Sequence, residues 1–228
     1  FYGFGKVETP ILEEEELFTK GVGVATDIAQ KEMFTLKTKG GDKLALRPEG
    51  TAPIVRAYIE HGMAGRPQPV KLSYMGPFFR YERPQSGRDR EFYQFGAELI
   101  GNKNPESDAE VIALAASMIE ALGLNDYRIR IGHIGVLRQK LADSGVPKER
   151  TAEILQKLDK KSYDEAELLL IDMGVSDLAR QEIFDLTETV GGKEVLSEVP
   201  GEAGEYLRSV VEILERMGVR DIDIDLGV

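Results

Sequence analysis

The stretch FRYERPQSGRDREFYQFGAE, residues 79–98, contains groups that could bind a charged ligand. It holds four arginines and four acidic residues, with aromatic and apolar residues on both sides of the charges. Arginine guanidinium groups bind phosphates and carboxylates through paired N–H donors. Carboxylates accept hydrogen bonds from ammonium groups. The stretch therefore predicts either a binding site for a charged ligand or a solvated hairpin whose charges keep the sheet edge soluble.

Strand alternation sorts the second half of this stretch into two faces. The faces are Phe92, Gln94, Gly96 and Glu98 on one side and Tyr93, Phe95, Ala97 and Leu99 on the other. The second set is apolar and is predicted to pack in the core. The first set is unusual for a solvated face because glycine weakens a strand. We expect Gly96 to leave a hollow where a ligand approaches the backbone.

The other groups of the stretch fit a ligand that has both phosphates and a ring. Arg80 and Arg88 offer planar forks for phosphate, and Phe92 offers an aromatic face for a flat ring. Glu98 offers a carboxylate to an amine. The connection from residue 81 to 91 is long for a hairpin, and long loops are often functional. The pattern alone leaves both the ligand site and the solvated hairpin open.

The elements that must position these residues follow from periodicity and turn signals. Strand patterns occur at 69–82, 90–101 and 221–226, and a hairpin pattern occurs at 32–48 around two glycines. Helical patterns occur at 50–63, 107–124 and 204–218, and a longer, charged helical stretch covers 146–190. This order predicts the α+β class, with a mostly antiparallel sheet flanked by helices and a helical insertion.

Three finer predictions concern single residues of these elements. Thr51 is expected to cap the helix at 50–63. His133 is expected to be a packed or hydrogen-bonded residue rather than a base, and His61 to end a helix. The helix at 204–218 is expected to bury Leu207, Val210, Val211 and Leu214.

Bulk properties exclude several functional classes. The chain has 228 residues, no cysteine, two histidines and a formal net charge of -11. The absence of cysteine removes disulfides and thiolate chemistry, and it favours a reducing, cytoplasmic location. Two distant histidines argue against a histidine-rich metal site. No apolar run reaches the length of a membrane span. Contacts with nucleic acid must be local, because the overall charge repels phosphate.

Three segments, in order along the chain, resemble a known family. The segments are FGKVETPILEEEELF, LALRPEGTAPIVRAY and FRYERPQSGRDREFYQFGAE. In this order they are similar to the first class II motif, the histidine-binding segment and the second class II motif of histidyl-tRNA synthetases. This family belongs to the class II aminoacyl-tRNA synthetases. The resemblance covers nearly the whole chain. It implies a class II catalytic fold, a homodimer whose interface includes Pro10, and the substrates ATP, histidine and tRNA(His), with Mg²⁺.

The resemblance also implies a role for each site residue. Arg80 and Arg88 would be the catalytic arginines, and Arg88 would also reach the reacting carboxylate of histidine. The implied ATP site is Arg80, Glu82, Arg88 and Phe92. The implied histidine site is Glu49, Thr51, Arg88, Gln94 and Glu98. The ligands of a metal ion stay unknown.

The implied reaction needs no covalent intermediate on the protein. The histidine carboxylate would attack the α-phosphorus of ATP, pyrophosphate would leave, and the histidyl group would pass to the tRNA. By the same resemblance, residues 1–144 would be the catalytic core with motifs 1 and 2. Residues 145–200 would be a helical insertion domain against the tRNA acceptor stem, and residues 201–228 would return to the core. We expect a fragment cut before the third motif, with adenylation absent or impaired.

Two rival interpretations stay open at this point. The main rival is the synthetase-like regulatory subunit of ATP phosphoribosyltransferase, which shares the fold and senses histidine without aminoacylation. The intact set of ATP-site residues favours a synthetase over this rival. The weaker rival is a structural or signalling module derived from the synthetase fold, and the intact site residues argue against it as well.

Overall fold

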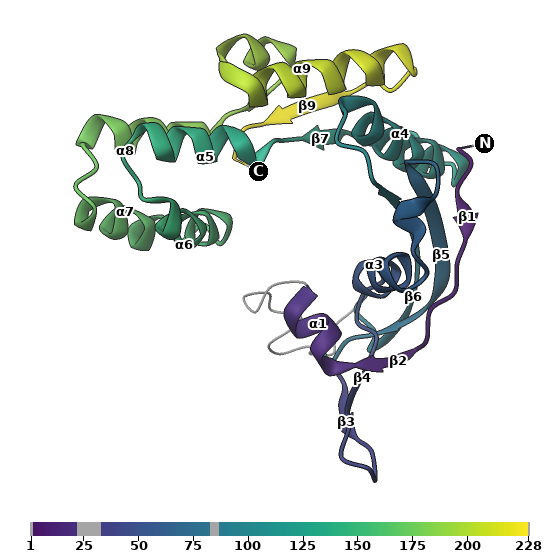
Figure 1. Ribbon diagram of the computed structural model, residues 1–228. Coiled ribbons are helices and arrows are strands. Elements are labelled where there is room, and N and C mark those ends of the chain that lie inside the picture. The colour runs from purple at the N-terminus through teal and green to yellow at the C-terminus, as the bar shows by residue number, and fades with distance from the viewer. Residues whose placement is uncertain (1, 22–32, 83–86, 228) are drawn as a thin grey trace. The chain divides into compact units, whose positions relative to one another are not determined.

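The computed structural model describes residues 2–21, 33–82 and 87–227. Contacts within the chain divide it into two units, Phe1–Lys103 and Asn104–Val228. Figure 1 shows that the first unit contains the long strands and that the second unit is mostly helical. No helix in the described part of the chain has the length and apolar character needed to cross a membrane.

Two small sheets and two α-helices form the described part of the first unit. Its elements are β1 (Gly5–Lys6), β2 (Leu12–Glu14), α1 (Glu15–Gly21), β3 (Thr35–Lys37), β4 (Lys43–Leu46), α3 (Thr51–Glu60), the 3-10 helix η1 (Met63–Gly65), β5 (Val70–Phe79) and β6 (Glu91–Ile100). One sheet has the order β1-β5-β6 and the other β2-β4-β3. The pairs β5–β6, β2–β4 and β3–β4 are antiparallel, whereas β1 pairs with β5 in parallel.

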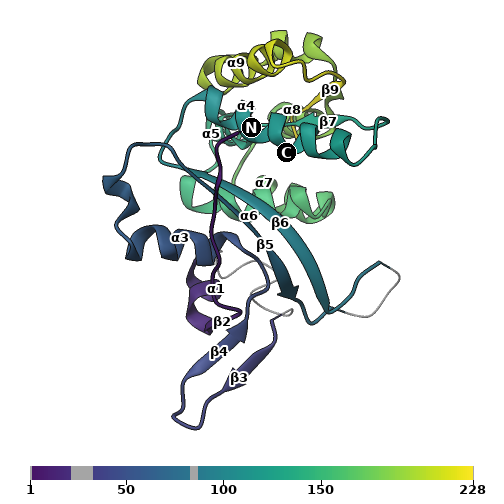
Figure 2. The ribbon, with the colours of Figure 1, turned by 90° about the vertical axis from the view of Figure 1, so that its right-hand side faces the viewer.

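The hairpin of β5 and β6 is the central feature of this unit. Its ten-residue strands pair along their whole length, from Val70 opposite Ile100 to Phe79 opposite Glu91. Figure 2 shows the two strands side by side. Helix α3 packs on one face of this hairpin, where Ile54 joins a buried cluster with Leu72, Tyr74 and Phe78 of β5. That packing fixes which face of the hairpin lies toward α3.

Six α-helices and a small mixed sheet form the described part of the second unit. Its elements are α4 (Pro105–Ala121), β7 (Ile129–Ile131), α5 (Ile134–Asp143), α6 (Lys148–Asp159), α7 (Tyr163–Asp172), α8 (Asp177–Glu188), β8 (Val190–Gly191), the 3-10 helix η2 (Lys193–Glu198), α9 (Gly201–Arg216) and β9 (Ile222–Asp225). Strand β9 lies between β7 and β8, parallel to β7 and antiparallel to β8. Helices α5 to α8 share a core of their own that includes Leu141, Ile154 and Leu170.

The predicted α+β class, with antiparallel strand pairs flanked by helices, is confirmed. The hairpin around Gly40 and Gly41 forms as β3–β4, and helices α6 to α8 lie within the charged helical stretch. Helix α9 buries all four residues expected of it, Leu207, Val210, Val211 and Leu214. His61 is the C-cap of α3, as predicted. The motif-based boundaries at 144 and 200 differ from the contact-based division after Lys103 and stay a prediction.

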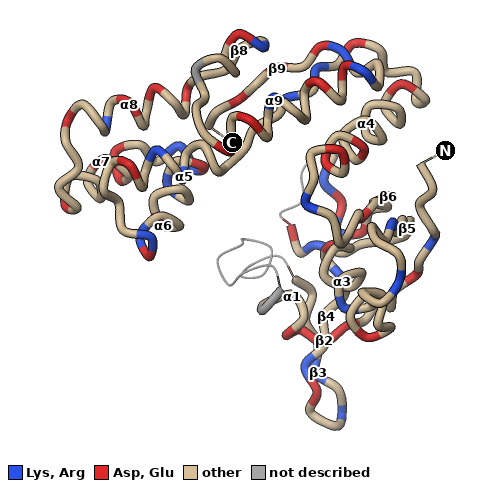
Figure 3. Tube along the Cα trace, turned by 45° about the horizontal axis from the view of Figure 1, so that its top comes forward, with Lys and Arg blue, Asp and Glu red and all other residues tan. Residues whose placement is uncertain are grey.

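Charge is spread along both units. Figure 3 shows acidic and basic residues interspersed along each of them. The net charge of -11 therefore does not exclude local clusters of arginine.

Candidate functional site

The candidate site lies on the face of the β5–β6 hairpin that α3 partly covers. The cross-strand register sets the neighbours on this face, which are the pairs Phe78–Phe92, Gly76–Gln94, Tyr74–Gly96 and Leu72–Glu98. Phe92, Gln94, Gly96 and Glu98 thus share one face, as the alternation predicted. All four are partly buried. The unusual row therefore faces the interior side of the hairpin rather than open solvent.

A cluster of charged groups lies at the end of the hairpin where its strands are connected. Glu82 lies 3.3 Å from the Nη1 of Arg88 and 3.9 Å from the Nη1 of Arg80. The guanidinium of Arg80 lies over the ring of Phe92, with 5.1 Å between Cζ and the ring centroid. The Nε of Arg80 donates to the backbone oxygen of Pro48 at 2.9 Å. The structure therefore brings all four predicted ATP-site residues together.

Three of the five predicted histidine-site residues form a second cluster around the start of α3, namely Glu49, Thr51 and Glu98. Arg88 lies in the arginine cluster instead, and Gln94 contacts Tyr74. Thr51 donates its hydroxyl to Glu98 at 2.8 Å. Glu49 accepts the backbone N–H of Thr51 at 2.6 Å and that of Ala52 at 3.0 Å. Burial raises the pKa of the Glu98 carboxyl, the Thr51 hydrogen bond lowers it, and the charge of Glu49 raises it further. A carboxylate that is costly to keep charged gains from a cationic ligand.

The predicted helix cap at Thr51 is wrong. The N-cap is Gly50, which makes no side-chain hydrogen bond to the helix. The Glu49 carboxylate caps the helix instead, because it accepts hydrogen bonds from two backbone N–H groups that the first turn leaves without partners. The hydroxyl of Thr51 is thereby left to bond Glu98.

The hollow expected at Gly96 is filled by the ring of Tyr74. A Cβ at Gly96 or at Gly50 would overlap the Tyr74 ring and its hydroxyl, so this ring passes between the two glycines. Gln94 donates its side-chain N–H to the Tyr74 hydroxyl at 3.4 Å. Tyr74 is thus a site residue that sequence reasoning missed. The signal that could have revealed it is the pairing of a strand tyrosine with a glycine on the facing strand.

The predicted core face of β6 is also wrong. Tyr93 is 72% exposed and Phe95 is 44% exposed, and Met75 on the neighbouring strand is 66% exposed. Alternation identifies residues that share a face, but it does not tell which face another element covers. Here α3 covers the mixed face of the hairpin.

Arg47 joins three segments around the site. Its side chain is 8% exposed. The Nε donates to the backbone oxygen of Pro77 at 3.0 Å, and the Nη1 donates to the backbone oxygen of Thr9 at 2.8 Å. The guanidinium lies 4.6 Å from the ring centroid of Phe78. A Cβ at Gly76 would lie 2.7 Å from its Nη2, so the glycine makes room for this contact.

The two clusters lie at different positions along one strand. Phe92 and Glu98 are six residues apart on the same face of β6, which corresponds to about 20 Å at 3.3 Å per residue. Gln94 lies between them. Residues 48–51 pass from the Arg80 contact at Pro48 to the Glu98 contact at Thr51. An extended ligand could therefore contact both clusters.

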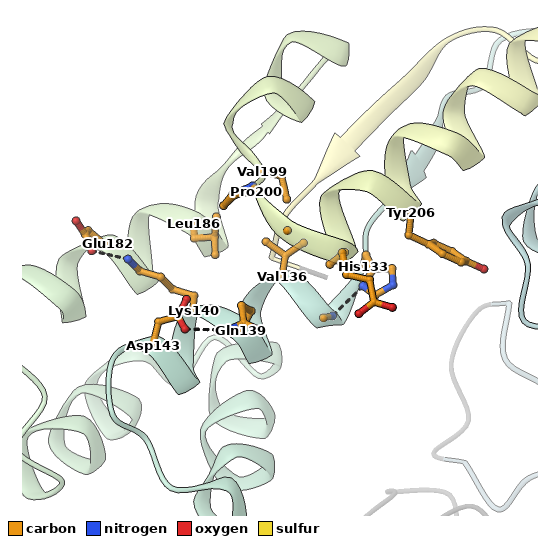
Figure 4. A pocket seen from close by; sticks show the side chains of 14 residues that line it. His133, Val136, Gln139, Lys140, Asp143, Glu182, Leu186, Val199, Pro200 and Tyr206 are labelled. Atoms are coloured by element: carbon orange, nitrogen blue, oxygen red, sulfur yellow. Dashed lines mark hydrogen bonds and ion pairs between the residues drawn. The ribbon is translucent and has the colours of Figure 1, made fainter.

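Two cavities lie apart from the row of Phe92, Gln94, Gly96 and Glu98 on β6. A cavity of about 1020 Å³ lies beside β2, α1 and α3 and reaches Glu49 and Thr51. Another, of about 610 Å³, lies wholly in the second unit, between α5, α8 and the start of α9 (Figure 4). In it, Lys140 pairs with Glu182 and Gln139 donates to Asp143, so these polar groups bond one another.

His133 borders the cavity of the second unit. Its Nδ1 accepts the backbone N–H of Gly135 at 3.0 Å, which makes it the N-cap of α5. The predicted hydrogen-bonded histidine is confirmed. Among the described residues, no group of three or more histidine, aspartate or glutamate side chains could hold a metal ion.

Comparisons with known proteins match the chain over most of its length. The family described as histidyl-tRNA synthetase matches residues 1–217. A histidine--tRNA ligase of Fervidobacterium nodosum is 39% identical over 97% of this chain and 51% of its own length. That of Desulforudis audaxviator is 53% identical over 64% of this chain and 36% of its own length. The chain spans about half, or less, of the length of these curated relatives.

A solved structure from Bacillus halodurans C has the same fold. It is described as an ATP phosphoribosyltransferase regulatory subunit/histidyl-tRNA synthetase. The two chains are 28% identical and superpose with a TM-score of 0.83. The match covers 100% of this chain and 60% of the Bacillus halodurans C chain.

Proposed function

Because the chain belongs to the histidyl-tRNA synthetase family, we propose that it provides the histidine and ATP sites of a histidine–tRNA ligase. One observation carries this proposal: a cationic cluster on Phe92 and an acidic cluster around Glu98 lie on the same face of β6. Such a face suits a ligand pair that has phosphates and a ring at one end and an amine at the other.

In this proposal Arg80 and Arg88 stabilise the phosphates of ATP, and the adenine stacks on Phe92. Glu82 meets the adenine amino group and orients both guanidinium groups, which its carboxylate contacts in the structure. The guanidinium of Arg80 lies over the ring of Phe92, which supports a role for this ring in contacts with flat, charged groups.

Histidine would bind at the other cluster. Glu98, Gln94, Thr51 and Glu49 hold its amino group and imidazole, and Arg88 contacts its carboxylate. The raised pKa of Glu98 fits this role, since a cationic amino group compensates for the cost of burying the carboxylate.

The reaction then requires alignment more than a nucleophile on the protein. A carboxylate oxygen of histidine attacks the α-phosphorus in line, a new P–O bond forms, and the bond to pyrophosphate breaks. The arginines stabilise the negative charge on the transferred group and the leaving group. The histidyl group then passes to a ribose hydroxyl at the end of tRNA(His), and AMP leaves.

Mg²⁺ would assist by neutralising phosphate charge. In nucleotide sites this ion is held by phosphate oxygens and one or two carboxylates. Of the described carboxylates near the arginine cluster, Glu82 is already contacted by two guanidinium groups. The described residues do not fit a metal site made by the protein alone, because they form no group of three or more possible ligands.

The regulatory-subunit alternative is favoured by one observation. The similar structure from Bacillus halodurans C carries that description together with histidyl-tRNA synthetase. A histidine sensor would use the Glu98 cluster and would not need the arginine cluster. The presence of Arg80, Glu82, Arg88 and Phe92 in one cluster supports the ligase.

Further proposals follow from family membership. A homodimer would include Pro10 and its neighbouring strand, residues 145–200 would be the insertion domain that contacts tRNA, and the location would be cytoplasmic. Residues 1–144 and 201–228 would belong to the catalytic core.

The test is histidine-dependent exchange of labelled pyrophosphate into ATP, with Glu98→Ala as the control. The proposal predicts that the chain binds both ATP and histidine, that any exchange depends on histidine, and that the variant loses both histidine binding and this exchange. A chain that binds histidine but neither binds ATP nor supports exchange would support the sensor instead.

A further inference from the structure

The cavity of the second unit is a groove that follows helix α5 along its whole length. Four of its lining residues recur at intervals of three or four positions and therefore lie on one side of this helix, namely His133, Val136, Lys140 and Asp143. The 10 residues of α5 correspond to about 15 Å at 1.5 Å per residue. With a volume of about 610 Å³, the groove is large enough for an extended small molecule.

One exposed carboxylate lies at each end of this groove. Asp143 is the last residue of α5, and it accepts from the neutral amide of Gln139 at 2.7 Å. Glu202 lies in the first turn of α9, which packs beside the start of α5, since a Cβ at Gly135 would lie 3.3 Å from the Cβ of Ala203. Among the described residues no ion pair neutralises either carboxylate, so both charges are available to a cationic ligand.

The lining between the two ends has an apolar part and no net charge. Val136, Leu186 and Val199 contribute the apolar side chains, and those of Val136 and Val199 are buried. Lys140 of α5 pairs with Glu182 of α8, so these two charges compensate each other (Figure 4). The groove therefore has negative charge at both ends and apolar side chains between them.

We propose that this groove binds a linear polyamine, a methylene chain with ammonium groups about 15 Å apart. One terminal ammonium group donates to Asp143 and the other to Glu202. The methylene chain between them lies on the apolar side chains and gains from leaving water. An anionic ligand would be repelled at both ends. This site is formed by the second unit alone and does not depend on the proposed ligase site.

The test is calorimetric titration of the full 228-residue chain with two diamines of different length. Hexamethylenediamine and dodecamethylenediamine both carry two ammonium groups, so the net charge of -11 attracts them alike. Only the longer diamine can reach both ends of the groove. The comparison therefore separates a site that is spanned from general attraction of cations.

Four variants identify the carboxylates that the diamine contacts. Asp143→Asn and Glu202→Gln each remove one carboxylate of the groove. Asp159→Asn and Glu205→Gln are the matched controls, because they change the net charge equally and lie at exposed positions outside the lining. Asp159 is also the last residue of its helix, α6, and Glu205 lies on α9 like Glu202.

We expect the unmodified chain to bind the longer diamine more tightly than the shorter one. Asp143→Asn and Glu202→Gln should each weaken binding of the longer diamine about 2- to 5-fold, the range for ion pairs at exposed positions, and change that of the shorter one little. The two control variants should leave both affinities unchanged. Equal affinities of the unmodified chain for the two diamines, equal losses in groove and control variants, or no binding of either diamine would overturn the inference.

Discussion

Gly96 is the residue at which the packing of the site can be tested most simply. Gly96→Ala would place a methyl group in the space that the Tyr74 ring occupies. We expect a loss of about 1–3 kcal/mol in the free energy of unfolding, because overpacking displaces the ring. Histidine affinity should fall as well. Urea denaturation and calorimetric titration measure the two effects.

Gly65→Ala is the control for this substitution. A Cβ there meets nothing within 4 Å, and the glycine does not have a positive φ. Its free energy of unfolding should stay near that of the unmodified chain. If Gly96→Ala behaves like Gly65→Ala in both measurements, Tyr74 does not fill the space between Gln94 and Glu98.

The raised pKa of Glu98 predicts that the stability of the fold depends on pH. Its pKa is raised from 4.5 in the folded chain, mainly by burial. The folded state therefore binds the proton more tightly than the unfolded state, so protonation of Glu98 stabilises the fold. Relative to Glu98→Gln, the unmodified chain should lose stability as the pH rises from below 4.5 through the raised pKa.

Thermal midpoints of the two proteins, measured across the acid range up to neutral pH, check this prediction. The difference between them isolates Glu98, since other titrating groups such as Glu13 are common to both. A difference that does not change with pH, or that changes with the opposite sign, would contradict the raised pKa.

At the scale of elements, Arg47 fixes the loop that carries Glu49 and Thr51. Arg47→Met would remove the bonds to Pro77 and Thr9 and leave two backbone oxygens without those donors. We expect a loss of about 2–4 kcal/mol in the free energy of unfolding, since bonds from charged donors contribute more than neutral ones. Arg66→Met, at an exposed position after η1, is the matched control. Equal urea midpoints for the two variants would show that Arg47 does not fix this loop.

The elements themselves could largely be predicted from the sequence. Alternation and glycine placement identify β3–β4 and β5–β6, and the apolar stripe of α9 is regular. These signals are local. The covered face of β6 could not be predicted in this way, because it depends on where α3 packs.

The candidate site was predictable to the same extent. Arg80, Glu82, Arg88 and Phe92 lie within one hairpin, so their proximity follows from neighbouring positions in the chain. Tyr74 was missed because its contact with Gly96 depends on the cross-strand register, which a long connection does not fix. The hydrogen bond from Thr51 to Glu98 could not be predicted either, because it joins residues 47 positions apart in the sequence.

At the scale of the whole molecule, the helical unit has a core separate from the residues of the site. Leu170 of α7 is fully buried in the cluster of α5 to α8. Leu170→Ala should lower the stability of these helices by about 2–5 kcal/mol. Hydrogen exchange should then increase in α5 to α8, and histidine affinity should be retained.

Leu168→Ala on the same helix is the control, since Leu168 is 67% exposed. It should change exchange little. Loss of histidine binding in Leu170→Ala, at a temperature where the helices stay folded, would contradict a site formed by the first unit alone.

The central claim is that one face of β6 binds ATP at the Arg80 end and histidine at the Glu98 end. Calorimetric titration of the unmodified chain, Arg80→Ala and Glu98→Ala with each ligand tests it most directly. Arg80→Ala should lose ATP binding and keep histidine binding, with at most a modest decrease because Arg80 also contacts Pro48. Glu98→Ala should lose histidine binding, keep ATP binding and keep its thermal midpoint close to that of the unmodified chain. Loss of both ligands in either variant, or of neither, would contradict the division of the face into two sites.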